Sequence, residues 1–153
     1  MKLKPKSFMP IKALLFSLSQ ITISSLLFAG CTINSPINTT KQFLSYWQKE
    51  QYNEAFNLFV KTTSQEENKF KIENFSPSEK AQLIEKTKKN RGKLLKFNVQ
   101  NAIPLKDNLL QQLNITEGYK VFFYTETEKE GAKNNEYFVL KVDNNWRLLP
   151  SIE

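Results

Sequence analysis

The single Cys and the absence of His limit the chemistry that this protein can perform. The chain of 153 residues contains a single Cys, at position 31, and no His. Without His, Ser-His-Asp and Cys-His catalysis and His-based metal sites are excluded. One Cys can form neither an internal disulfide nor a zinc site with further Cys ligands. Because no paired carboxylates, glycine-rich phosphate loop or metal-ligand spacing occurs either, we expect no metal and no cofactor.

Cys31 follows a segment that is typical of a secretory signal peptide. Residues 1–12 carry four lysines and no acidic residue, and Ala13–Gly30 carries no charge over 18 residues. The segment ends in Leu-Leu-Phe-Ala-Gly-Cys, with small residues directly before the Cys. A basic start, an uncharged apolar stretch and small residues at its end indicate a signal peptide. We therefore predict that residues 1–30 are removed and take no part in the fold.

The end of this segment resembles the lipobox of bacterial lipoproteins. Ala29, Gly30 and Cys31 match its pattern, whereas Phe28 stands where Leu is usual. The resemblance implies cleavage before Cys31 and acylation of its thiol, for example with palmitate. Each buried CH2 of an acyl chain contributes about 0.8 kcal/mol, and two or more chains anchor a protein stably. The alternative is an uncleaved transmembrane anchor, because 18 uncharged residues are just long enough to span a bilayer.

Either anchor places the rest of the chain in the cell envelope, on the outer side of the cytoplasmic membrane or at the outer membrane. Residues 31–40 are then the lipidated Cys and a polar tether, and residues 41–153 form one domain. Removing the four signal lysines leaves 18 basic against 15 acidic residues, so the net charge falls from +7 to +3. Because the strong basicity belongs mostly to the signal peptide, we expect no nucleic-acid partner.

The first part of the domain has the spacing of helices. Apolar residues recur at intervals of three and four from Phe43 to Phe59, behind an N-cap at Thr39 or Thr40. This pattern predicts either one helix or two, over about 41–50 and 52–60. The following residues, 61–75, are polar and charged and are predicted to form a loop.

A third helix is predicted from residue 76 to about residue 90. The sequence Ser-Pro-Ser-Glu at 76–79 offers an N-cap, a Pro at the first helical position and a Glu that completes a capping box. Lysines gather toward the predicted end of the helix, where they favour its dipole. Gly92 is a fitting residue for the turn that ends it.

From residue 94 onward the period of the pattern is two. One face of a strand over about 94–103 is predicted to carry Leu95, Phe97, Val99, Asn101 and Ile103. Three further strands, Gly118–Thr127, Glu136–Val142 and Trp146–Leu149, predict an antiparallel meander with the first strand beside it. A tight turn is expected at Asp143-Asn144-Asn145. The segment Pro104–Glu117 is either a short helix capped by Asp107 or a packed loop.

This order of elements resembles the nuclear-transport-factor-2-like, or cystatin-like, cone fold. It is also similar to small bacterial lipoproteins of unknown function that carry this domain. The matching features, in order, are Trp47, a Tyr-x-x-Ala-Phe helix, Arg91-Gly92, a Tyr-rich strand from Tyr119 to Tyr124, and Trp146-Arg147. The resemblance implies an α+β domain with N-terminal helices packed on a curved antiparallel sheet of about four strands, often around a conical pocket. Fold alone selects no function.

We expect a non-enzymatic function with one of two modes of binding. In the first, a small apolar or amphipathic ligand enters the cone, lined by Trp47, Tyr52, Phe97, Phe123, Phe138 and Trp146. In the second, the pocket is filled and an apolar sheet face docks an envelope protein or a second copy of the chain. Phe122 and Tyr124 would lie on that face, opposite Val121 and Phe123.

The alternative is an enzyme. The resemblance includes isomerase-like and dehydratase-like enzymes that use a carboxylate in the pocket, often with a Tyr. The candidate residues are Tyr46, Tyr52, Tyr124, Glu126 and Glu136. A buried carboxylate with a raised pKa could act as a base. However, Glu126 and Glu136 flank a charged hairpin, which favours a solvated position for both.

Overall fold

The computed structural model describes residues 35–65 and 69–150. The predicted signal peptide at 1–30 and the predicted lipidation site at Cys31 lie outside these residues. The described part is α+β and contains four helices, a four-stranded antiparallel sheet and a separate two-stranded sheet. None of its helices is both long enough and apolar enough to span a bilayer.

Helix α1 (Pro36–Gln48) starts earlier than the sequence predicts. Ser35 is the N-cap, since its hydroxyl accepts a hydrogen bond from a backbone N–H of the first turn, and Pro36 suits the first helical position. The prediction of a tether up to residue 40 and a cap at Thr39 or Thr40 was wrong here. Both threonines are buried, and their hydroxyls donate to backbone carbonyls four residues earlier.

A second helix, α2 (Tyr52–Phe56), follows after a break in the chain. Glu50 adopts a left-handed conformation with φ of 60°, which no α-helix can continue through. Of the two predicted possibilities, two helices are therefore correct, and the second is shorter than expected.

The predicted loop at 61–75 is a β-hairpin. Strand β1 (Val60–Ser64) pairs antiparallel with β2 (Phe70–Asn74), and Thr62 lies opposite Ile72. The loop prediction was wrong because it relied on polar composition. β-branched residues favour extended structure, and Phe70 and Ile72 also pack against a cluster of buried apolar residues.

Helix α3 (Pro77–Asn90) confirms its predicted boundaries. The Ser76 hydroxyl accepts from the Glu79 N–H, and the Glu79 carboxylate accepts from the Ser76 N–H at 2.8 Å. This is the predicted capping box. Gly92 follows the helix with φ of +68°, which only glycine adopts without strain.

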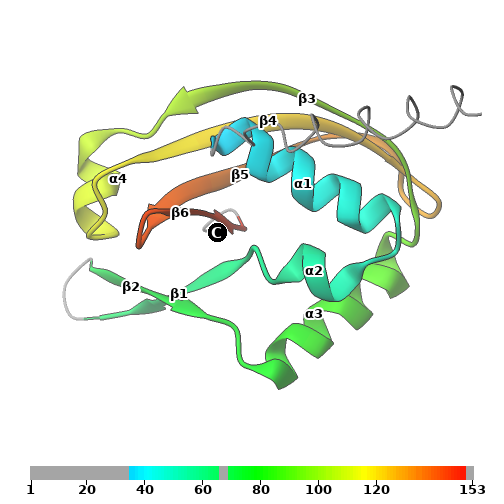
Figure 1. Ribbon diagram of the computed structural model, residues 1–153, viewed down its shortest axis with the longest axis horizontal. Helices are drawn as coiled ribbons and strands as arrows, with labels where there is room; N and C mark the ends of the chain where they lie inside the picture. The colour runs from blue at the N-terminus through cyan, green and yellow to red at the C-terminus, as the bar shows by residue number, and fades with distance from the viewer. Residues whose placement is uncertain (1–34, 66–68, 151–153) are drawn as a thin grey trace, which may run out of the picture. The chain divides into compact units, whose positions relative to one another are not determined.

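The main sheet has the order β3-β4-β5-β6 and is antiparallel throughout. Its strands are β3 (Leu94–Pro104), β4 (Gly118–Thr127), β5 (Gly131–Val142) and β6 (Asn145–Leu149). The predicted meander, with the first strand beside it, is confirmed, although β5 begins earlier than predicted. Asp143 and Asn144 have φ of 48° and 62° in the predicted tight turn. Figure 1 shows the long strands arching over α1.

Strand β3 departs from the predicted alternation. Its pairing with β4 shifts between Leu94 and Lys96 and again between Val99 and Asn101. Each β-bulge inserts one extra residue and reverses the side to which the following residues point. Consequently Leu94, Phe97, Val99 and Ala102 pack against the core. Leu95 and Ile103, which were predicted to share the face of Phe97, are 51% and 50% exposed.

The ambiguous segment 104–117 contains a short helix, α4 (Asp107–Gln112). Lys106, not Asp107, occupies the N-cap position, and its side chain makes no capping hydrogen bond. Leu105 and Leu113, on either side of α4, are buried. The segment is therefore a helix held in place by apolar contacts at both ends.

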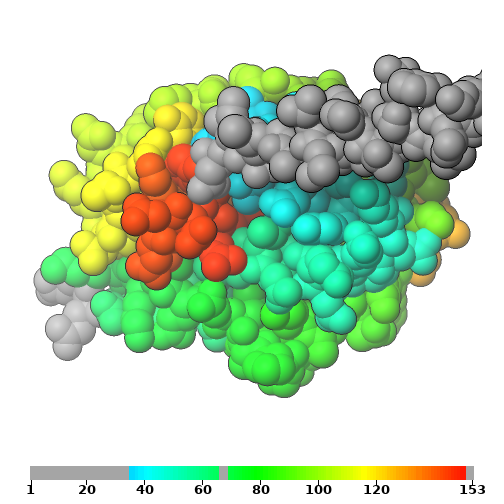
Figure 2. Space-filling model, viewed as in Figure 1, coloured from blue at the N-terminus to red at the C-terminus, as the bar shows by residue number. Residues whose placement is uncertain are grey.

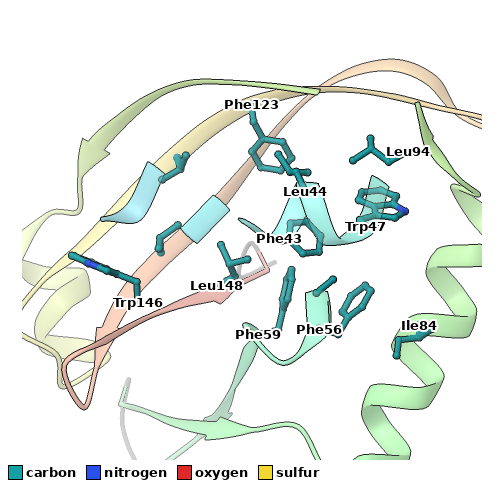
Figure 3. Close-up of a cluster of buried hydrophobic side chains, with 13 residues drawn as sticks. Phe43, Leu44, Trp47, Phe56, Phe59, Ile84, Leu94, Phe123, Trp146 and Leu148 are labelled. Carbon is teal, nitrogen blue, oxygen red and sulfur yellow. The ribbon is translucent and has the colours of Figure 1, made fainter. Parts of the chain in front are cut away.

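The inward face of the sheet packs on α1 and forms the main core. Thirteen buried residues make up this cluster, and helix α1 contacts all four strands. Phe43 lies at its centre, with its ring centroid 4.9 Å from that of Phe59 and 5.8 Å from that of Trp47. Figure 3 shows Phe43 and Trp47 on α1 and Phe59 on the segment that follows α2, with Phe123 of β4 above them.

A second apolar cluster covers one end of the outward face. It contains Val60, Leu105, Leu113, Leu140 and Leu149. Residues of the β1–β2 hairpin and of α4 thus bury part of the sheet surface that α1 leaves open. In Figure 2 the atoms of α4 (yellow) lie against those of the β5–β6 hairpin (orange). The segment 104–117 is therefore a partial cover of the outward face.

Candidate functional site

The six residues predicted to line one pocket lie on both faces of the sheet. Trp47, Phe123 and Trp146 are 0%, 0% and 6% exposed and belong to the main core. Tyr52 and Phe97 pack against that core and are partly buried. Phe138 instead packs against the second cluster, on the outward face. The structure therefore brings five of these residues to a packed interior and places the sixth elsewhere.

Polar contacts fix the buried end of α1. The Trp47 Nε1–H donates to the Gly92 carbonyl at 3.2 Å. Arg91 donates from Nε to Glu130 at 2.8 Å and from a terminal nitrogen to the Asn135 side chain at 3.0 Å. Partial burial opposes ionisation of Glu130, but the hydrogen bond and the charge of Arg91 outweigh it and lower its pKa. This network is satisfied internally, which favours a structural role.

Tyr52 stands at the edge of the core. The ammonium group of Lys88 lies 4.8 Å from the centroid of its ring. Burial, followed by the nearby Glu50 carboxylate, raises the pKa of the Tyr52 hydroxyl above its usual value. The hydroxyl is therefore protonated at neutral pH and is not a base.

The candidate carboxylates lie on the outward face, away from the main core. Glu136 pairs with Lys120 at 2.9 Å, and its side chain is 41% exposed. The Tyr124 hydroxyl donates to Glu126 across 3.5 Å, at the limit of a hydrogen bond. Among residues 35–65 and 69–150, no group of three or more His, Cys, Asp or Glu could hold a metal ion.

An apolar groove runs between α4 and the outward face of the sheet. Its volume is about 550 Å³, within the range of small-molecule sites. We call it the outer groove. Its apolar lining consists of Ile103, Pro104, Leu105, Leu109, Phe122 and Phe138. Two of these residues, Phe122 and Phe138, were named from the sequence, the first for docking and the second for ligand binding.

Lysines stand at the rim of the outer groove. Lys120 is neutralised by Glu136, and its ammonium group also lies 5.3 Å from the Phe138 ring centroid. Lys106 is exposed and forms no ion pair within the described part of the chain. The groove therefore combines an apolar floor with one cation that is not neutralised by an ion pair. Sequence reasoning missed Lys106, because a lone lysine carries no signal of its own.

A smaller pocket of about 310 Å³ lies between α2, α3 and β6. We call it the Asn57 pocket. Phe56, Phe59 and Phe75 provide aromatic surface, and Lys80 and Arg147 provide positive charge. The sequence pattern named Arg147 only as part of a terminal Trp-Arg pair. Neither its position near Lys80 nor the pocket could be read from spacing, because 67 positions separate the two residues in sequence.

Comparison with known proteins gives no relative. No model of a known protein family matches this chain, and no curated protein matches it either. The argument for a binding site therefore rests on the geometry of the described residues, and the argument for a lipid anchor rests on the sequence around Cys31.

Proposed function

We propose that this chain is a lipid-anchored, non-enzymatic protein of the cell envelope that binds a small amphipathic ligand with an acidic head in the outer groove. The observation that carries the proposal is the contrast between the two faces of the sheet. The inward face is packed, with Trp47 and Phe123 fully buried, whereas Phe122 and Phe138 line a groove on the outward face. An apolar groove with a few polar groups at its rim is the usual form of a small-molecule site.

Charge complementarity selects the ligand class. The apolar part of the ligand would lie on Phe122 and Phe138, and Lys106 at the rim would meet an acidic head. A buried apolar chain gains about 25 cal/mol for each Å² removed from water, which makes the apolar part the main source of affinity. A single-chain fatty acid has both parts.

A cystatin-like, cone-type fold is part of this proposal. Three helices precede β3–β6 in the chain, and the strands arch over α1 (Figure 1), as the cystatin-like resemblance implies. Because domains of this kind include enzymes as well as binders, the fold by itself does not select the binding role, which rests on the outer groove. The position of the groove differs, because it lies outside the arch and not within it.

A matched pair of residues tests the outer groove. Ile103 and Leu95 are both aliphatic, both on β3 and about equally exposed, but only Ile103 lines the groove. We expect Ile103→Ala to weaken binding of a fluorescent fatty acid to the anchor-free chain Thr32–Glu153, whereas Leu95→Ala binds normally. That chain contains the compact unit Ile33–Glu153. Equal affinity of the wild type, Ile103→Ala and Phe138→Ala for the fluorescent fatty acid would refute binding in the outer groove.

The lipid anchor has its own test. In a bacterial host fed a labelled fatty acid, the wild-type chain should carry the label, and Cys31→Ser should lose it and accumulate as a larger precursor. The thiol is the only one in the chain, so no other Cys can substitute. Normal processing of the Cys31→Ser variant would contradict lipid anchoring at Cys31.

Docking of an envelope protein, or of a second copy of the chain, is the second candidate. It is favoured by the exposure of Ile103 and by Phe122 and Tyr124, which are only partly buried and lie on the outward face of β4. Native mass spectrometry of the anchor-free chain distinguishes the candidates. A bound small mass supports the ligand, whereas a dimer or a protein adduct supports docking.

A further inference from the structure

Arg147 and Lys80 converge on a single residue, Asn57. One terminal nitrogen of Arg147 donates to the Asn57 backbone carbonyl at 3.0 Å, and the Lys80 ammonium donates to the Asn57 side-chain oxygen. Two positive charges from β6 and α3 are thus held at the same short segment after α2. Like charges at close range repel each other, and the repulsion is relieved when an anion binds between them.

Neither cation has an acidic partner in the described part of the chain. The other arginine of that part, Arg91, is paired with Glu130, and Lys61 is paired with Glu79 at 2.6 Å. Glu79 is next to Lys80 in sequence, but its carboxylate is engaged by Lys61 and by Ser76. The acid nearest to Lys80 along the chain is therefore directed elsewhere, and no carboxylate of residues 35–65 and 69–150 forms an ion pair with Lys80 or Arg147.

The surroundings strengthen the field of these cations. The Asn57 pocket, whose volume is about 310 Å³, is lined by the partly buried Phe75 and, at its floor, by Phe56 and Phe59, each of which is 4% exposed. A cleft with charge of one sign and low-dielectric walls focuses the electric field on its interior. The guanidinium group also presents several donors in a planar fork that matches the oxygens of a carboxylate or a phosphate.

We infer that the Asn57 pocket is a binding site for a small organic oxyanion, with the anionic group between Lys80 and Arg147 and an apolar or aromatic body against the phenylalanines. The oxyanion is a carboxylate or a phosphate, since both fit the same donors. This site is separate from the outer groove, which is lined by α4, β3, β4 and β5. The inference therefore stands or falls independently of the proposed function.

The probes are benzoate, phenyl phosphate, acetate and inorganic phosphate. Each is titrated into the full chain, purified in non-ionic detergent, while sodium chloride holds the ionic strength constant. A ligand that binds only the folded state raises Tm with its concentration. We expect benzoate or phenyl phosphate to raise Tm at lower concentrations than acetate or phosphate, because only the aromatic probes carry a ring that can pack against Phe75. A response to benzoate identifies a carboxylate site, and a response to phenyl phosphate alone identifies a phosphate site.

Substitutions assign the effect to the pocket. Arg147→Gln and Lys80→Met should each lower the affinity for the aromatic anion by about tenfold, as expected for the loss of one charge-assisted hydrogen bond. Arg147→Lys should recover only part of the affinity, because it keeps the charge and loses the fork. The matched control is Lys86→Gln, which removes one exposed charge from the same helix α3 away from the pocket.

Three results would overturn the inference. The first is no rise of Tm with any of the four probes. The second is an equal rise in the wild type, Arg147→Gln and Lys80→Met, which would indicate a general salt effect. The third is a loss of affinity in Lys86→Gln as large as in the two pocket variants. That result would show that binding depends on the net charge of the protein and not on a defined site.

Discussion

The guanidinium group of Arg91 lies over the indole ring of Trp47, with 4.9 Å between Arg91 Cζ and the ring centroid. The same side chain donates hydrogen bonds to Glu130 and Asn135, so it links α1 to the β4–β5 turn and to strand β5. Trp47 in turn bonds the carbonyl of Gly92, the residue after Arg91. These contacts connect the end of α3 to the main core through two adjacent residues.

Replacing Arg91 with Met should destabilise the domain. The substitution removes the cation over Trp47 and leaves the partly buried Glu130 without its closest partner, at a cost of about 2 kcal/mol. Urea denaturation followed by tryptophan fluorescence measures the change. Arg147→Gln is the control, with an expected loss of about 0.5 kcal/mol, because Arg147 makes a single exposed hydrogen bond, at 3.0 Å, to the Asn57 carbonyl. Equal losses in the two variants would contradict this role of Arg91.

The N-cap of α3 gives a second prediction. Ser76→Ala removes the hydroxyl that accepts from the Glu79 N–H and should cost about 1 kcal/mol of the free energy of unfolding. Ser76→Asp should retain most of the stability, since Asp also caps helices. The two variants are compared by urea denaturation at neutral pH. A loss in Ser76→Asp as large as in Ser76→Ala would show that the cap is not the cause.

Glu79 should make stability depend on pH in the acid range. Its hydrogen bond from Lys61, followed by those from Ser76, lowers the pKa of Glu79 from 4.5 to about 2. Because the pKa is lower in the folded state, the unfolded state binds the proton first, and stability falls as pH drops from about 4.5 to about 2. The Tm difference between wild type and Glu79→Gln should be largest above pH 5 and shrink toward pH 2. A constant difference would refute this linkage.

Gly118 leaves no space for a side chain beneath α4. A Cβ at this position would lie 2.9 Å from Leu105 Cδ1 and 3.2 Å from Leu140 Cδ2. Gly118→Ala should therefore destabilise the domain by about 1 kcal/mol through overpacking. Leu105→Ala removes the closest atom, so the double variant should lose less than the sum of the two single losses. Urea denaturation of all four proteins gives the coupling, and simple additivity would contradict the predicted contact.

Signals within a few residues predicted their elements correctly. The capping box at Ser76 and Glu79 gave the start of α3, and the Asp143-Asn144 pair gave the β5–β6 turn. In both cases the residues that determine the structure are adjacent in the chain, so no knowledge of tertiary contacts is needed. The order β4-β5-β6 followed from the short turns between these strands.

Features that depend on distant partners were not predictable. The bulges of β3 arise from its pairing with β4, so alternation alone assigned Leu95 and Ile103 to the wrong side. Strand β4 is apolar on both faces, and the sequence does not say which face a helix covers. For this reason Phe123 and Phe138 were assigned to one pocket although they lie on opposite faces.

The two bulges in β3 bear on how the protein avoids aggregation. An edge strand exposes unpaired backbone groups that can recruit the edge of another molecule. The regular pairing of β3 is confined to the short runs Lys96–Val99 and Asn101–Pro104, and the Gln48 side chain donates to the Leu95 carbonyl at 2.9 Å. A neighbouring strand would therefore meet an interrupted edge. Under the proposed lipid anchoring, such an edge would protect copies of the chain that lie close together on a membrane surface.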